Sequence, residues 1–160
     1  METITVVAEE KSEKYDELFP QIVALVRDEK DLIANLANIS AALKSTFSPF
    51  SWVGFYRMGQ SELILGPFQG KVACVRIKIG KGVCGTAAKE RKTVLVPDVT
   101  KFPGHIACDP ESKSEIVVPI IYEGILHGVM DIDSEKIDCF DEIDKINLEK
   151  IAAIVAPKFN

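Results

Sequence analysis

Apolar side chains recur every three or four residues between positions 12 and 46, a period that predicts two amphipathic helices. Pro20 interrupts the first stripe, so we expect a helix boundary or a first helical turn at that position. Residues 45–49 are rich in serine and end in a proline, which predicts the end of the second helix. The positions that form the two stripes are Tyr15, Leu18, Phe19, Ile22, Val23, Val26, Leu32, Ile33, Leu36, Ile39 and Leu43.

After residue 51 the pattern changes to short β-branched and aromatic runs between turn residues, which is typical of strands. The last two runs flank Glu123-Gly124 and predict a β-hairpin. Helical spacing returns from Gly82 to Arg91 and again from residue 141 to 155. The predicted strands are 52–56, 62–65, 73–77, 93–96, 115–122 and 125–132.

This order of elements predicts an α+β fold: a central, mostly antiparallel β-sheet with the N- and C-terminal helices packed on it. We expect one domain over residues 1–160, with a helical region at 1–48, the sheet and its loops at 49–135, and the last helix at 139–157. The predicted loop at 97–111 is long. Structureless loops longer than about 12–15 residues are uncommon in compact domains and are usually functional or disordered.

Composition excludes several classes of protein. The chain has 160 residues, of which 47% are apolar and 27% charged, and a net charge of −5 with scattered lysines and arginines. An acidic chain of this kind is not expected to bind nucleic acid, and its apolar runs are too short to cross a membrane. Residues 1–20 carry five glutamates and no apolar stretch, so we expect no secretory signal and a place in the reducing cytoplasm.

Three of the four cysteines, Cys74, Cys84 and Cys108, lie within 35 residues of one another in glycine-containing frames. Free cysteine is often a small buried hydrophobe, and we interpret Cys139, in an acidic stretch, in that way. The spacings do not match the short ligand pairs of a zinc site, even with His105 as a ligand, so no metal is expected. Neither histidine lies in a recognisable cysteine-protease frame.

The three remaining cysteines differ in their predicted environments. Cys84 falls in the first turn of a predicted helix, close to Lys81, and both features favour the thiolate. Cys108 lies in the long loop with few local partners, and His105 is near enough in sequence to assist it. Cys74, on a predicted strand, is equally compatible with a core position and with a redox role.

Six blocks of the chain resemble one family, the free methionine-(R)-sulfoxide reductases, which consist of a single GAF domain. The blocks cover much of the chain between residues 50 and 135, and three cysteines in these frames distinguish this family from other GAF domains. They are Trp52–Tyr56, Gly66–Cys74, Gly82–Ala87, Gly104–Asp109, Ser114–Pro119 and Gly128–Ser134.

The resemblance implies a GAF-like fold and the thiol-dependent reduction of free methionine-R-sulfoxide. It implies Cys108 as the nucleophile, Cys84 as the first resolving thiol and Cys74 as an additional one, with Cys84 as the alternative nucleophile. No bound cofactor is expected: the resemblance implies thioredoxin as the electron donor, supplied in turn by NADPH, and it favours a homodimer.

The resemblance also places four side chains around the substrate. Trp52 matches an aromatic residue that packs on the methylsulfinyl end, and Glu115 and Asp133 match acidic positions of the pocket. Asp131 lies two residues from Asp133 on the same face of a predicted strand. Glu115 and Asp133 are expected to pair the ammonium of a free amino acid, or one of the two to stay protonated as the acid for the sulfoxide oxygen.

Without the resemblance, other interpretations of these residues hold. The acids would be solvated at a strand end, since carboxylates are mostly exposed, and Trp52 would be a core residue. The alternative function is a non-catalytic GAF sensor for a small, nucleotide-type ligand, and a purely structural domain is the third.

Overall fold

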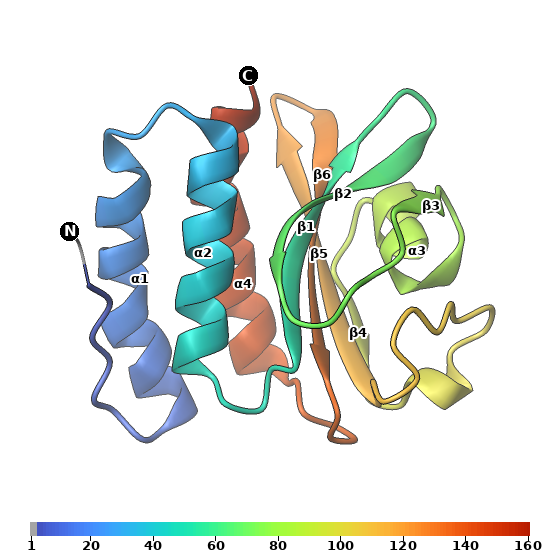
Figure 1. Cartoon of the computed structure of the whole chain (residues 1–160), viewed down its shortest axis with the longest axis horizontal. Coiled ribbons are helices and arrows are strands. Elements are labelled where there is room, and N and C mark those ends of the chain that lie inside the picture. The colour runs from blue at the N-terminus through green and yellow to red at the C-terminus, as the bar shows by residue number, and fades with distance from the viewer. Residues whose placement is uncertain (1–2) are drawn as a thin grey trace.

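The computed structural model describes residues 3–160, which fold into one six-stranded antiparallel sheet with helices on both faces (Figure 1). The strand order is β3-β2-β1-β6-β5-β4. The helices are α1 (Lys11–Arg27), α2 (Leu32–Thr46), α3 (Gly82–Glu90) and α4 (Glu142–Val155). The strands are β1 (Trp52–Met58), β2 (Glu62–Gln69), β3 (Arg76–Lys78), β4 (Val94–Val96), β5 (Ser114–Tyr122) and β6 (Ile125–Ser134).

Each central strand contributes alternate side chains to two separate cores. Val53 and Phe55 of β1 face α1, α2 and α4, whereas Trp52 and Tyr56 face α3 on the other side. The predicted packing of the N- and C-terminal helices on one sheet is confirmed. The face that carries α3 is left for the loops around residues 70–75 and 102–113 (Figure 1).

Local signals explain where the helices begin. The Asp31 side chain accepts a hydrogen bond of 2.8 Å from the Ala34 nitrogen at the start of α2. Asp141 and Asp144 form a reciprocal capping box at the start of α4. Asp144 is fully buried and also accepts from the Tyr15 hydroxyl at 2.8 Å and from the Lys11 ammonium at 2.6 Å, which binds α1 to α4.

Two predicted boundaries are wrong. Pro20 lies inside α1 and not at a boundary or in a first turn. The strand expected at residues 73–77 is only β3, so Cys74 lies in the loop before it and not on a strand. The predicted long loop contains one short 3-10 turn at Val99–Lys101. No helix within residues 3–160 is both long and apolar enough to cross a bilayer.

Candidate active site

Strand register brings the predicted substrate-binding residues together on the face of the sheet opposite α1, α2 and α4. Asp133 of β6 is paired with Trp52 of β1 on one side and with Glu115 of β5 on the other. Asp131 lies two residues along β6, on the same face, opposite Gly54. All four predicted side chains line one pocket, together with Cys84, His105 and Cys108.

Trp52 forms one wall of this pocket and is only 4% exposed. Its ring stacks on Phe68 with 5.2 Å between ring centroids, and its Nε1 donates to the Lys71 carbonyl oxygen at 3.0 Å. Gly54 makes this position available, because a Cβ there would collide with the indole and with Phe68. The indole is therefore fixed from both sides.

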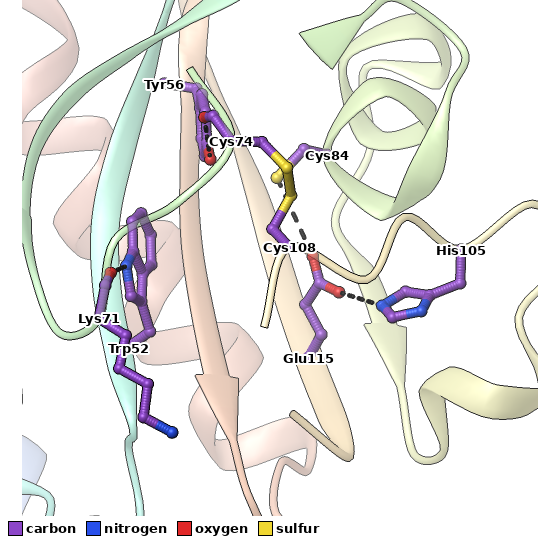
Figure 2. The surroundings of a disulfide bond; sticks show 8 residues. All are labelled: Trp52, Tyr56, Lys71, Cys74, Cys84, His105, Cys108 and Glu115. Atoms are coloured by element: carbon purple, nitrogen blue, oxygen red, sulfur yellow. Dashed lines mark hydrogen bonds and ion pairs between the residues drawn. A yellow bond between two sulfur atoms is a disulfide. The ribbon is translucent and has the colours of Figure 1, made fainter. Parts of the chain in front are cut away.

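Two loops form the roof of the pocket, and a disulfide between Cys74 and Cys108 joins them (Figure 2). The two Cα atoms are 5.5 Å apart although 34 residues separate the cysteines in sequence. The Tyr56 hydroxyl donates to the Cys74 carbonyl oxygen at 2.9 Å, and so ties the first loop to β1.

Lys71 holds the same two loops together electrostatically. Its ammonium forms an ion pair with Glu111 and lies 3.7 Å from a carboxylate oxygen of Asp109, both on the loop that carries Cys108. It also lies 3.4 Å from a Glu135 oxygen beyond β6. The disulfide and this ion cluster therefore close the roof at two points.

Cys84 differs from its prediction. Its thiol is free and buried at the start of α3, with its Sγ 4.0 Å from the Glu115 Oε1 (Figure 2). Burial, and then the nearby carboxyls of Asp131 and Glu115, raise the pKa of this thiol well above its ordinary value. The expected thiolate is therefore wrong for this state of the protein: the helix N-terminus is outweighed by burial and by the acids.

The disulfide also differs from the expected order of thiol use, because Cys108 is paired with Cys74 and not with Cys84. Cys139, which we interpreted as a small buried hydrophobe, is a free thiol that is only half-buried and packs against the core formed with α1, α2 and α4.

Glu115 and Asp131 are buried and Asp133 is half-buried, and removal of these carboxyl groups from water raises the pKa of each. The pKa of Asp131 rises to about 6, while those of Glu115 and Asp133 rise well above their ordinary values because neighbouring carboxyls add to the effect of burial. The Ser112 hydroxyl donates to Asp133 at 2.9 Å, which partly offsets this rise. Three carboxyls this close together resist simultaneous ionisation, and a positively charged group bound among them would stabilise their ionised forms.

One carboxylate oxygen of this group, Oδ1 of Asp131, is buried and has no hydrogen-bond partner among residues 3–160. Buried polar atoms are nearly always paired, so an unpaired oxygen aimed into a pocket indicates a ligand position. Ligand atoms of Asp131, Glu115 and Cys84 lie within 4.8 Å of one another, a spacing that would also suit a metal ion. The same geometry suits an ammonium group, which needs several acceptors at once.

His105 lies at the opening of the pocket, with its Nε2 3.8 Å from the Glu115 Oε2 (Figure 2). Burial lowers the pKa of His105, so the ring is neutral at pH 7 and forms no ion pair there. In this disulfide state the cavity measures about 40 Å³, room for about three water molecules. An amino acid with a side chain as long as that of methionine needs the roof to open.

Several residues of the site were not predicted from the sequence. Tyr56 and Ser112 bond to the roof and to Asp133, and Lys71 holds the loops, yet each is an ordinary polar residue in its local context. Their partners are 18 to 64 residues away in sequence. Only Lys71 and Tyr56 lie in blocks that carried the family resemblance.

Comparison with known proteins agrees with this site. The GAF domain family matches residues 26–157. The free methionine-R-sulfoxide reductase of Saccharomyces cerevisiae is 50% identical over 91% of this chain and 85% of its own. GAF domain-containing protein A of Dictyostelium discoideum is 54% identical over 91% and 92% of the two chains.

A solved structure is similar to this chain over nearly its whole length. Free methionine-R-sulfoxide reductase from Neisseria meningitidis, in complex with its substrate, superimposes with a TM-score of 0.97 and 46% identity, covering 99% of this chain and 96% of that one. The chain therefore belongs to the GAF domain family and, within it, to the free methionine-R-sulfoxide reductases.

Proposed function

We propose that this protein is an oxidoreductase that reduces free methionine-R-sulfoxide to methionine. The observation that carries the proposal is the Cys74–Cys108 disulfide placed directly above a pocket with buried acids. A disulfide in that position is the expected product of a sulfoxide reduction carried out by cysteine thiols.

The reaction begins with both roof cysteines reduced. The Cys108 thiolate attacks the sulfoxide sulfur while an acid protonates the oxygen; the oxygen passes to Cys108 as a sulfenic acid and methionine leaves. The Cys74 thiol then attacks the Cys108 sulfur, the S–O bond breaks, and water and the observed disulfide form. The substrate sulfur gains the two electrons that the pair of thiols loses.

The pocket acids supply both the proton and the selectivity for a free amino acid. Burial raises the pKa of Glu115 and Asp133, which favours the protonated form of each, and either carboxyl can donate to the sulfoxide oxygen. The unpaired Asp131 oxygen accepts from the ammonium group, which a methionine residue inside a protein lacks. Trp52 packs on the methyl group beside the reacting sulfur.

The remaining thiol, Cys84, is assigned a different role from the one expected. Because it is buried beside Glu115 and its pKa is raised, it contributes a neutral wall of the pocket in this proposal. The resolving thiol is Cys74, for which the disulfide is the support.

The proposal includes an electron donor and a setting. Thioredoxin, which receives its electrons from NADPH, restores the dithiol by disulfide exchange in the reducing cytoplasm. That the protein forms a homodimer stays a prediction from the family resemblance. Analytical ultracentrifugation, which gives the mass of the particle in solution, tests it.

The test uses free methionine sulfoxide with dithiothreitol as the reductant, so that it does not depend on a protein partner. We expect turnover of the R epimer, none of the S epimer, and loss of turnover in Cys108→Ser. Cys139→Ser is the matched control and keeps activity, because Cys139 lies in the other core. Full turnover by Cys108→Ser would contradict the assignment of the nucleophile. Absence of turnover together with tight nucleotide binding would favour a sensor.

A further inference from the structure

We propose that an apolar surface around the disulfide, formed by Val72, Val75 and Ile106, is the docking site for a protein dithiol that reduces the Cys74–Cys108 bond. We call these three residues the disulfide rim. The inference rests on the proposed function, because it concerns the step that returns the oxidised protein to its dithiol form.

The three rim residues expose apolar side chains to solvent. Val72 is 88% exposed, Val75 63% and Ile106 40%. Nine large apolar side chains are exposed among residues 3–160, and these three all lie within two positions of Cys74 or Cys108. Contiguous exposed apolar residues mark interaction sites more often than isolated ones do.

The rim is held in a fixed arrangement. Ile106 lies over Gly82, where a Cβ would come within 3.2 Å of its side chain, so it rests on the start of α3. The Val75 carbonyl oxygen accepts from the Leu65 nitrogen at 2.9 Å, which fixes the chain after Cys74 to β2. Ile106 and the backbone at Val75 are therefore held in place before a partner binds, which lowers the entropic cost of association.

The chemistry of the enclosed disulfide determines the class of partner. An incoming thiolate attacks one sulfur, the S–S bond breaks, and the electron pair leaves on the other cysteine, which gives a mixed disulfide between the two proteins. The second thiol of the partner then attacks the partner's sulfur in this mixed disulfide. This step releases the reduced protein and forms a disulfide within the partner. Cys74 and Cys108 are half-buried, so a partner reaches them from outside, whereas Cys84 is buried beneath. A protein dithiol must lay its surface on the rim to do this.

A small dithiol needs only a path to one sulfur, and this difference gives the test. The rate of reduction of the oxidised, full-length protein is measured with thioredoxin and, separately, with dithiothreitol. Val75→Ser and Val72→Ser are each expected to slow thioredoxin about fivefold to tenfold, because each removes an apolar contact at the docking surface. Reduction by dithiothreitol is expected to stay within about twofold, since neither change adds a charge that would repel a thiolate.

Val7→Ser is the matched control. Val7 is 79% exposed, and its nitrogen bonds to Glu17 of α1, at the opposite end of the molecule from α3 (Figure 1). It should leave both rates unchanged.

Equal thioredoxin rates in the wild type and both variants would overturn the docking site. A matching loss with both reductants would overturn it as well, because the disulfide itself would then have changed. If thioredoxin fails on the wild type while dithiothreitol succeeds, the partner is not a protein dithiol of this class. The proposed function is judged separately, by sulfoxide turnover with dithiothreitol.

Discussion

Replacing Asp131 by asparagine should stabilise the folded protein at neutral pH, although the same change should weaken substrate binding. Asp131 is buried, and burial raises its pKa from 3.8 to about 6. Each unit of pKa shift corresponds to about 1.4 kcal/mol, so ionising this carboxyl in the folded protein costs about 3 kcal/mol more than in the unfolded chain. Asparagine has no charge to bury.

The effect has a defined pH window. Between pH 3.8 and about 6 the folded protein binds more protons at this site than the unfolded chain does. Stability that depends on protonated Asp131 is therefore complete below pH 3.8 and is lost as the pH rises through about 6. The asparagine variant should match the wild type near pH 3.5 and exceed it by up to about 3 kcal/mol at pH 8.

Urea denaturation of the oxidised protein at pH 3.5 and at pH 8 measures both free energies of unfolding. Asp16→Asn, an exposed acid on α1, is the control and should change neither value appreciably. If Asp131→Asn gave the same change at both pH values, or lowered stability at pH 8, burial of a charge would not be the dominant effect at this position.

Two further substitutions test the packing around the site and between the helices. Tyr15→Phe should cost about 1.5–3 kcal/mol of unfolding free energy in urea, because Asp144 loses a buried hydrogen bond from the hydroxyl; a loss below about 0.5 kcal/mol would contradict this. Gly54→Ala should displace the ring of Trp52, raising the KM for the sulfoxide and shifting the emission of the only tryptophan in the chain. Unchanged emission with unchanged KM would show that the ring does not depend on the glycine.

The parts of the fold that follow from local pattern were predictable. Helical periodicity identified α2 and α4, because each helix buries one face. The turn residues between two β-branched runs identified the β5–β6 hairpin. The position of Cys74 was not predictable, because the apolar residues around it resemble a strand. Within the predicted strand at 73–77 only Arg76 and Ile77 pair with β2, and Val75 is left exposed.

The site shows the same division between local and distant effects. The alternation of Asp131 and Asp133 was visible in the sequence, and pairing of neighbouring strands brought Glu115 beside them. The protonation of Cys84 was not visible, because the helix start that favours a thiolate is local while the acids that oppose it come from β5 and β6. The electrostatics of a buried thiol depend on the whole fold.

The small cavity beneath the disulfide has a consequence for the redox balance of the protein. With about 40 Å³ of free space, the oxidised state has no room for an amino acid, so a bound ligand and the closed disulfide exclude one another. A ligand that binds only the dithiol form stabilises that form by mass action. The reduction potential of the Cys74–Cys108 pair should therefore rise with the concentration of such a ligand, and methionine that accumulates would hold the protein in its reduced state.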